Sequence, residues 1–512
     1  MNVSKKDLTK FTNSIFQFLS IGLFIFYLVN NIKNNIYEIL FIDERMLIDD
    51  IYNVWLVEDL YNRFSNVSNQ SLKNILIIFI ELAYGGDLRY GRLWSNFFTI
   101  IVGPATFISD TVVILFSRFL NSLLFFSGAY FLSKYLVEKK YLWISVFTIY
   151  SFSSVEFVHR VPKPDPMVII FVALGIKFLI NKKYYHSIFF LALASFLKIN
   201  AIIIFAFLWI YIFLRSSENK IRLILKTSLI TLGSLFIVNP ILLIPPLNLG
   251  GNQIPNFYKI YLNWLTTQGS NSDEVYFSFT FFMNWIDELS LFYKFPNSIL
   301  FLIVIIFALG FISKEILTSS DDLSKYLLFI FSFYILFYFF FIERAWTHYL
   351  HLPFSLLLIA FLRVFKKRNI SLIPTILIIL FGLVGNTSNI DRFLNDKTFN
   401  MNDRLDYVSV ETQDDAKILV SKIVNEIKII YDQNQHLNKN LVYWHPDLIT
   451  PRNKVTYDEN FYVREYWGDK NKVNFAIEEA DIFVTYTDYE ITDSVVKTNI
   501  ENFYIYYFKS LD

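Results

Sequence analysis

The chain has 512 residues, of which 54% are hydrophobic, 19% aromatic and 18% charged, against about 25% charged in an average soluble domain. The net charge of +1 offers no basic surface to nucleic acid, and the absence of cysteine excludes disulfides, thiolate metal sites and thiol catalysis. The apolar residues lie in long runs, and about 20 of them in a row can cross a hydrocarbon core of ~30 Å. The composition predicts an all-α polytopic membrane protein whose main environment is the lipid bilayer.

The first apolar run extends from about Ile15 to Val29 and follows a polar start that contains three lysines. No small-x-small cleavage site comes after it, so we expect an uncleaved membrane helix with a cytoplasmic N-terminus. Residues 31–92 are mixed in character and form the first extracytoplasmic loop.

This loop carries an acidic motif directly after the first helix, with Asp43 and Glu44 followed by Asp49 and Asp50. Charge at a membrane surface is costly to hold near lipid, which favours a functional site. A solvated turn after the helix is the alternative interpretation.

Ten further apolar runs predict ten further crossings. They are 117–135, 141–158, 165–181, 186–197, 199–214, 222–244, 298–316, 325–342, 349–365 and 370–387. The connections that this order places in the cytoplasm all carry lysine or arginine, as the positive-inside rule requires. Those connections are 134–140, 181–183, 215–222, 314–325 and 363–368. The total is eleven crossings, or thirteen if 93–116 forms a hairpin, and either number places the C-terminus outside.

Lys198-Ile-Asn200 interrupts the apolar stretch 186–214 and leaves two segments that are each short for a full crossing. Broken helices at membrane depth are tolerated where they line a cavity or a binding site. The outer loop 245–297 is rich in aromatic residues and is typical of segments that lie against the lipid headgroups.

From about Ser388 the composition becomes that of a soluble domain. Helical spacing of apolar residues covers 411–433, and β-like runs follow at 441–444, 482–486 and 503–507. We therefore expect a transmembrane domain over 1–390 and a small extracytoplasmic α/β domain over 391–512.

The predicted topology gathers acids and bases at the outer face, surrounded by apolar helices. They are Asp43, Glu44, Asp49, Asp50, Arg89, Arg92, Asp165, Lys198, Arg344, His348 and His351. A carboxylate at the interface suits a general base, and lysine and arginine suit a phosphate leaving group. A groove in the membrane suits a lipid tail. Together they favour transfer of a group from a phospholipid-like donor to an acceptor outside the membrane.

Each of these residues also has a purely structural interpretation. Lys198 near a helix end is able to snorkel to the interface, and Asp165 after a proline is suited to an N-cap. Arg344 is able to form a helix-end ion pair with Glu343. His348 and His351 are more often interfacial anchors than metal ligands.

Four short motifs, in their order, resemble those of membrane glycosyltransferases of the C type (GT-C). The resemblance is to the protein O-mannosyltransferase and lipid A aminoarabinose transferase branch, families 39 and 83, and covers roughly residues 10–390. The motifs are Asp43-Glu44 after the first helix, Lys163-Pro164-Asp165 at the start of a helix, Leu193 to Lys198 at the helix break, and Arg344 with His348 to Pro353. The sequence departs from the family at Tyr90 to Leu93 and at Ile199-Asn200.

The resemblance implies a GT-C fold of about 11–13 transmembrane helices and a polyprenyl-phosphate-linked sugar as donor. It implies that Asp43 is the catalytic base and that Glu44 positions the acceptor or the sugar. It further implies that Lys198 and Arg344 hold the donor phosphate, with His348 and Tyr349 nearby. Asp165, Arg89, Arg92, Asp49 and Asp50 would line the same cavity. No cofactor is required, and the acidic loop would accept a divalent metal ion that nothing in the sequence demands.

We therefore predict an inverting glycosyltransferase of the cytoplasmic membrane that acts at its outer face. The acceptor is a glycolipid, a cell-wall glycan or a protein. The alternatives are a transporter or flippase of lipid-linked sugars, a polysaccharide polymerase or ligase that uses a diphosphate-linked glycan, and an inactive scaffold. A transporter should place its charges near the bilayer midplane and show two related halves, and the sequence shows neither.

Overall fold

The computed structural model describes most of the helical part of the chain and the central elements of its C-terminal part. The described residues are 5–33, 47–48, 51, 92–152, 162–239, 277–342, 345, 347–364, 372–395, 413–434, 441–444, 462–465, 481–485, 495–501 and 503–508. The chain divides into two compact units. The first comprises 1–33, 50–107 and 115–392, and the second comprises 34–49, 108–114 and 393–512.

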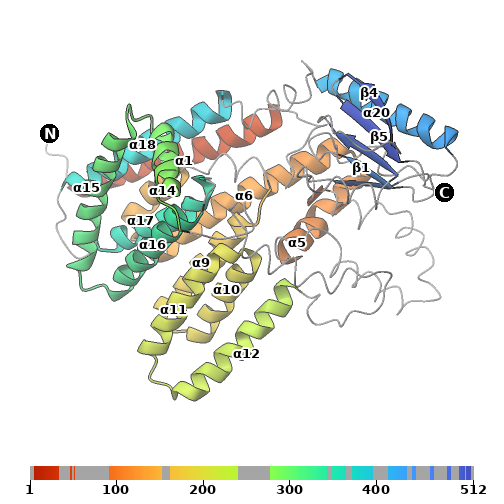
Figure 1. Ribbon diagram of the computed structural model, residues 1–512. Helices are drawn as coiled ribbons and strands as arrows, with labels where there is room; N and C mark the ends of the chain where they lie inside the picture. The colour runs from red at the N-terminus through yellow and green to blue at the C-terminus, as the bar shows by residue number, and fades with distance from the viewer. Residues whose placement is uncertain are drawn as a thin grey trace. The chain divides into compact units, whose positions relative to one another are not determined.

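The first unit is a bundle of helices (Figure 1). Its helices are α1 (Lys5–Lys33), α5 (Arg92–Val102), α6 (Asp110–Leu136), α7 (Leu142–Tyr150), α9 (Asp165–Ile180), α10 (Tyr184–Leu197), α11 (Ile202–Arg215), α12 (Lys220–Val238), α14 (Phe279–Phe292), α15 (Ser298–Leu317), α16 (Asp322–Phe341), α17 (His351–Val364) and α18 (Leu372–Asn395). Short 3-10 turns lie at η1 (Gly103–Phe107), η2 (Lys139–Tyr141), η3 (Ile199–Ala201) and η5 (Thr347–Leu350).

Six segments in the described part of the chain are long and apolar enough to cross a membrane. They are Phe11–Val29, Val112–Leu136, Lys220–Val238, Ser298–Leu317, Asp322–Phe341 and Thr347–Val364. Three apolar segments are shorter: Tyr184–Leu197, Ile202–Arg215 and Ile376–Asp391. The apolar helices indicate a multi-pass membrane protein, whereas the total of eleven to thirteen crossings stays a prediction.

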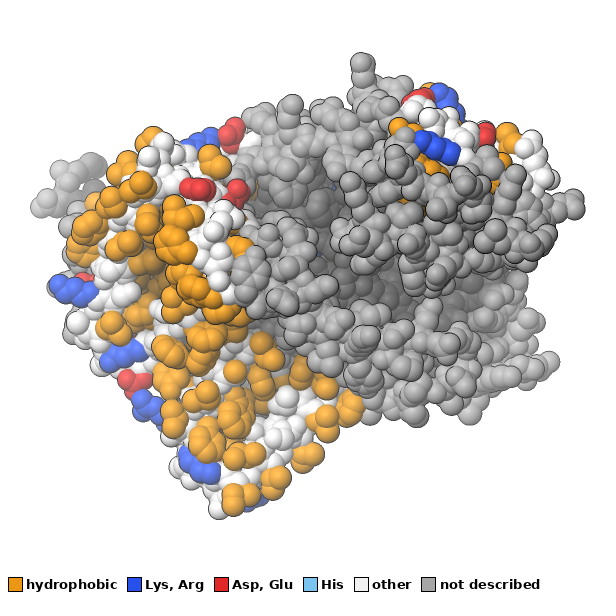
Figure 2. All heavy atoms as spheres, in the orientation of Figure 1, with side chains coloured by type: hydrophobic (Ala, Val, Ile, Leu, Met, Phe, Trp, Pro, Cys, Tyr) orange, Lys and Arg blue, Asp and Glu red, His pale blue; other side chains and the backbone are white. Residues whose placement is uncertain are grey.

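The surface of the bundle has the character that a bilayer requires. Leu229 on α12 and Ile306 on α15 are 69% and 59% exposed, although both side chains are wholly apolar. Figure 2 shows hydrophobic side chains over much of the described helical surface, with charged side chains along its lower left margin. Such a surface is stable against lipid tails and would be unfavourable in water.

Ion pairs join the helix ends that were predicted to face the cytoplasm. Arg215 at the end of α11 pairs with Asp322 at the start of α16. Arg363 near the end of α17 donates from Nε to Asp321 at 3.0 Å and from Nη1 to the Leu136 carbonyl, at the end of α6, at 3.4 Å. Four of the five lysine- and arginine-bearing connections thus have helix ends at one end of the bundle, in agreement with the alternation read from the sequence.

The close packing of α18 on α7 shows how helices of the bundle associate with one another. A Cβ atom on Gly385 would collide with the Ser151 backbone carbonyl, so only glycine allows this approach. Asn386 and Asn389 donate from Nδ2 to the carbonyls of Phe147 at 3.0 Å and Tyr150 at 2.7 Å. Small residues and side-chain amides at a helix contact are the usual means of association inside membranes.

The second unit contains helix α20 (Gln413–Gln433) and a five-stranded sheet. The strands are β1 (Leu441–Trp444), β2 (Tyr462–Glu465), β3 (Ile482–Thr485), β4 (Val495–Ile500) and β5 (Phe503–Phe508), in the spatial order β2-β1-β3-β5-β4. β1 pairs in parallel with β2 and β3, and β5 pairs antiparallel with β3 and β4. Strands were predicted at β1, β3 and β5, and α20 lies where a helix was expected.

α20 is tied to the sheet by two polar contacts. Lys422 pairs with Glu501 at 2.7 Å, and the Tyr431 hydroxyl donates to Asp481 at 3.3 Å. Burial, with the neighbouring Asp481 carboxylate, raises the pKa of Tyr431. The tyrosine therefore stays a neutral donor at any physiological pH.

Candidate functional site

Lys198 lies at the predicted helix break and is the central residue of the candidate site. It closes α10 with an extended backbone, φ −147° and ψ 121°. Its N–H donates to the Ala194 carbonyl at 3.1 Å, and its own carbonyl accepts from Ala201 in η3 at 3.0 Å. The backbone groups freed by the break are thereby used, and the Lys198 side chain is left 3% exposed inside the bundle.

Asp165 is the partner of Lys198. The Lys198 Nζ atom lies 2.7 Å from both carboxylate oxygens of Asp165, whose side chain is 14% exposed. Asp165 is the first residue of α9, and Pro164 rather than Asp165 occupies the N-cap, so the predicted capping role is wrong. An acidic residue in the first turn is still favoured there, because the helix dipole attracts negative charge.

A second buried lysine stands beside this pair. Lys163 is 3% exposed, and its N–H donates to the Asn121 side chain on α6 at 3.3 Å. Lys163 and Lys198 both lie within electrostatic range of His348. Two ammonium groups, one carboxylate and one imidazole thus converge inside an apolar bundle.

Aromatic rings form one wall of this cluster. The Lys198 Nζ atom lies 5.7 Å from the centre of the Tyr349 ring, which stacks on the Tyr338 ring of α16 at 5.7 Å. The His348 ring lies 4.5 Å from that of Tyr349. The Tyr334 hydroxyl donates to the backbone carbonyl of Asn200, which fixes the start of α11 against α16.

His351 begins α17 and is also part of the cluster. It is 3% exposed, packs on Phe125 at 5.0 Å and lies within electrostatic range of Asp165. The α9, α10, α16 and α17 ends that meet here are opposite the ends joined by Arg215 and Arg363. The cluster therefore lies at the end of the bundle that was predicted to face outward.

An apolar cavity of about 280 Å³ lies beside the cluster in the same unit. Its wall is formed by side chains of α14 to α18 and by Thr148 and Phe152. Phe339 lines the cavity, and its neighbour Tyr338 stacks on the polar side against Tyr349. Phe152 also lines it and contacts the His351 ring at 6.5 Å. The cavity has the chemistry of a hydrocarbon site.

The structure thus brings together five of the residues predicted from the sequence: Asp165, Lys198, His348, Tyr349 and His351. Arg92 begins α5, is 2% exposed, and donates from its backbone N–H to Asn239 after α12 at 3.4 Å. It lies at the same end of the bundle. The remaining predicted residues, Asp43, Glu44, Asp49, Asp50, Arg89 and Arg344, lie outside the described residues.

Sequence reasoning assigned no role to Asn200 or Tyr338, and it named Lys163 only as part of a motif. Tyr338 stands in an uninterrupted aromatic run, and the chain has 32 tyrosines, so no local signal distinguishes it. Asn200 offered a signal, because a polar residue two positions after the lysine of a helix break is able to face the same cluster.

In the part of the chain that the structure covers, no group of three or more His, Asp or Glu side chains is placed to hold a metal ion. The acidic residues that would accept a divalent ion lie outside that part. The suggestion of a metal site stays untested.

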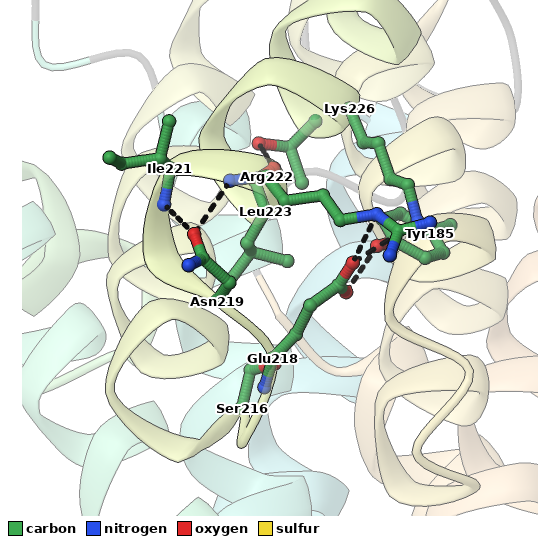
Figure 3. A network of polar contacts seen from close by, with 9 residues as sticks. Tyr185, Ser216, Glu218, Asn219, Ile221, Arg222, Leu223 and Lys226 are labelled. Atoms are coloured by element: carbon green, nitrogen blue, oxygen red, sulfur yellow. Dashed lines mark hydrogen bonds and ion pairs between the residues drawn. The ribbon is translucent and has the colours of Figure 1, made fainter.

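A different polar network joins α10 to α12 at the opposite end of the bundle (Figure 3). Glu218 accepts from the Tyr185 hydroxyl and from Lys226 at 3.1 Å, while Asn219 caps α12 by accepting from two backbone N–H groups. The hydrogen bond from Tyr185, followed by that from Lys226, lowers the pKa of Glu218. Every polar group in this network has a nearby partner, which is typical of a structural fastening.

Comparison with models of known protein families and with curated protein sequences found no match to this chain.

Proposed function

We propose that the chain is an inverting glycosyltransferase that moves a sugar from a polyprenyl-phosphate donor to an acceptor hydroxyl at the outer face of a membrane. The observation that carries this proposal is the enclosed Lys198–Asp165 pair at the helix break. A membrane bundle excludes charge unless a partner or a function requires it. Lysine is a compact point charge suited to a phosphate, and Asp165 holds it in place before the donor arrives.

The proposed reaction is a single displacement. The acceptor oxygen attacks the anomeric carbon, and the bond from that carbon to the phosphate oxygen breaks. The acceptor proton passes to a carboxylate, for which we propose Asp43, with Glu44 positioning the acceptor or the sugar. Polyprenyl phosphate leaves with the bonding electron pair, and Lys198 and Arg344 stabilise its negative charge. No cofactor takes part in this scheme.

The apolar cavity supports a lipid-linked donor rather than a water-soluble one. A chain of isoprene units contains no hydrogen-bonding group, and the cavity wall is almost wholly hydrocarbon. Phe339 lines the cavity and is the neighbour of Tyr338, so we propose that the phosphate lies near Lys198 while the first isoprene units lie in the cavity. His348, Tyr349 and Asp165 would then surround the phosphate and the sugar.

The test uses purified full-length protein in lipid vesicles, radiolabelled polyprenyl-phosphate sugars, and a membrane extract as the source of acceptor. We expect transfer by the wild type and a loss of about 100-fold or more in Asp43→Asn, because a general base is removed. Lys198→Met should lose transfer as well. Lys183→Met is the matched control, since Lys183 lies at the opposite, exposed end of the same helix.

The outcomes separate the rival functions. Transfer that survives in Asp43→Asn would move the base to another carboxylate. Transfer only from a diphosphate-linked glycan would favour a polymerase or ligase. Lipid-linked sugar that crosses the bilayer without any transfer would refute the enzyme and favour a flippase.

A further inference from the structure

A stack of three aromatic rings leads from Lys198 to helix α14. The Tyr349 ring, whose centre lies 5.7 Å from the Lys198 Nζ atom, stacks on Tyr338 with 5.7 Å between the ring centres and 21° between the planes. Tyr338 stacks in turn on Trp285 of α14, at 6.2 Å and 26°. These three rings, which we name the aromatic column, come from η5, α16 and α14 and are all buried in the bundle.

Trp285 is the anchored end of the column. Its side chain is wholly buried, and its indole N–H donates to the Ile342 carbonyl at 3.0 Å. Its ring is nearly parallel to that of Phe339, at 5.5 Å and 6°. The Ser278 N–H, at the start of α14, donates to the Phe340 carbonyl at 2.9 Å. The last carbonyls of a helix have no partner within it, so α14 supplies two of the donors that the end of α16 requires (Figure 1).

Tyr338 connects this anchor to the helix break. Its hydroxyl shares a hydrogen bond with the side chain of Asn200, which lies in η3 two residues after Lys198. The Tyr334 hydroxyl, one turn earlier on α16, donates to the backbone carbonyl of Asn200. Tyr338 therefore reaches the surroundings of Lys198 in two ways, through the ring of Tyr349 and through the segment that directly follows Lys198.

A lysine needs such support if its ammonium group is to meet a ligand at a fixed point. Its stem is flexible, and a binding group acts well only when packing and hydrogen bonds hold it within about 0.5 Å of the productive position. Asp165 holds the Lys198 ammonium through both oxygens at 2.7 Å, and the face of the Tyr349 ring attracts the same charge. Apolar side chains would fill this space equally well, but the hydrogen bonds to Asn200 and Ile342 also fix how the rings are turned.

The column is separate from the cavity proposed for the lipid chain. Ile286 and Phe339, the sequence neighbours of Trp285 and Tyr338, line the cavity, whereas Trp285 and Tyr338 do not. A change in the column should thus disturb the charged group and leave the hydrocarbon site in place.

We propose that Trp285 and Tyr338 are positioning residues that hold the Lys198 ammonium at the point where it meets the phosphate of the lipid donor. This inference rests on the glycosyltransferase function proposed above and deepens it, because it names residues that shape the phosphate site without touching the donor. Tyr338 acts through Tyr349 and Asn200, and Trp285 acts through Tyr338. Loss of either side chain weakens recognition of the phosphate and leaves recognition of the lipid chain unchanged.

The test compares binding of two lipids to the full-length protein in phosphatidylcholine nanodiscs. One is a polyprenyl phosphate, and the other is the polyprenol of the same length, which lacks the phosphate. Tyr338→Phe and Trp285→Leu should weaken binding of the polyprenyl phosphate by about 2- to 12-fold, the value of one lost hydrogen bond or aromatic pair. Binding of the polyprenol should stay within about twofold, because the cavity is intact. Trp285→Phe keeps a ring but loses the N–H, so its affinity for the phosphate lipid should lie between those of the wild type and Trp285→Leu.

Two control variants remove the same groups elsewhere in the bundle. Trp209→Leu removes an indole whose N–H donates to Thr227 on α12 at 3.1 Å and whose ring stacks on Phe213. Tyr326→Phe removes a hydroxyl from the helix that carries Tyr338, where the Tyr326 ring packs on Tyr211. Neither control should change the affinity for either lipid. If Trp285→Leu fails to fold, Tyr338→Phe decides the question, because it removes a single oxygen atom.

Failure of the inference and failure of the proposed function give different results. Equal loss for both lipids in Tyr338→Phe, or no loss for either, overturns the positioning role and leaves the glycosyltransferase intact. A folded Trp285→Leu that binds the polyprenyl phosphate as the wild type does overturns the role of Trp285. A wild type that binds the polyprenyl phosphate no better than the polyprenol has no phosphate site, and this result refutes the proposed function itself.

Discussion

Removal of either charge from the Lys198–Asp165 pair should destabilise the bundle strongly, and removal of both should not. At an effective dielectric constant of ~20, two unit charges separated by the 2.7 Å between Lys198 Nζ and Asp165 Oδ1 attract each other by roughly 6 kcal/mol. Much of that is offset by the cost of removing both charges from water. The side chains are only 3% and 14% exposed, so a lone charge that remains after substitution finds little solvent.

We expect Lys198→Met to lower the free energy of unfolding by about 3–5 kcal/mol, because Asp165 is left buried without its partner. Asp165→Leu should cost a similar amount, because Lys198 is then left buried without its partner. The double variant should lie within about 1 kcal/mol of the wild type, since an apolar pair replaces an ion pair in an apolar bundle. The double variant should nevertheless bind no polyprenyl phosphate.

The assay is a double-mutant cycle on the unfolding free energy, measured in mixed micelles by titration with a denaturing detergent. A coupling energy below about 1 kcal/mol would show that the two charges are not paired in the membrane, and the phosphate site would then lose its foundation. A double variant as unstable as the sum of the singles would refute the same reasoning. Lys183→Met again serves as the control, with an expected change below about 0.5 kcal/mol.

Two further predictions concern the packing of the bundle. Glu218→Gln should lower the melting temperature at neutral pH. The difference should vanish in acid, because the lowered pKa of Glu218 gives stability that is present above its ordinary value of 4.5 and is lost as the pH falls through the lowered value. The reasoning would be refuted if the difference in melting temperature persisted below the lowered pKa of Glu218, or if it equalled the loss caused by Tyr185→Phe at every pH. Either result would assign the effect to the Tyr185 hydroxyl alone. Gly385→Ala should lower the free energy of unfolding by about 1–3 kcal/mol or more, because the added Cβ meets the rigid Ser151 carbonyl. Gly233→Ala is the control and should cost nothing, since the space around Gly233 is open. Equal melting temperatures for the two variants would refute the close approach of α18 to α7.

Alternation of the crossings was the part of the fold that the sequence predicted best. Apolar length and the positions of lysine and arginine are local properties, and they assigned Asp165, Lys198 and His348 to one membrane face. The observed contacts bring these three residues to one end of the bundle. The break at Lys198 was also predictable, because a charged residue divides two apolar segments that are each too short to span.

The sequence could not predict which residues at that membrane face pair with one another. Lys198 and Asp165 are 33 positions apart, and nothing local specifies that α9 and α10 turn these two side chains toward each other. Asn200 and Tyr338 were missed because their contact depends on the packing of η3 against α16. In the C-terminal unit, β2 and β4 were missed since Tyr462 to Glu465 is short and half charged, and β4 carries Lys497 at its centre.

The contrast between the ion pairs at the two ends of the bundle is the strongest reason to place function at the Lys198 end. Arg215 and Asp322 are 53% and 47% exposed, so their pair contributes at most about 1 kcal/mol and costs little to form. Lys198 and Asp165 are enclosed, and an enclosed pair is often no more stable than the apolar residues that could replace it. The Lys198–Asp165 pair adds little net stability and requires α10 to end at Lys198. For helix packing alone, apolar residues at these two positions would be at least as favourable. The ion pair is reasonable only if the ammonium group must be held ready for an anionic ligand, which is the role that the proposed reaction gives it.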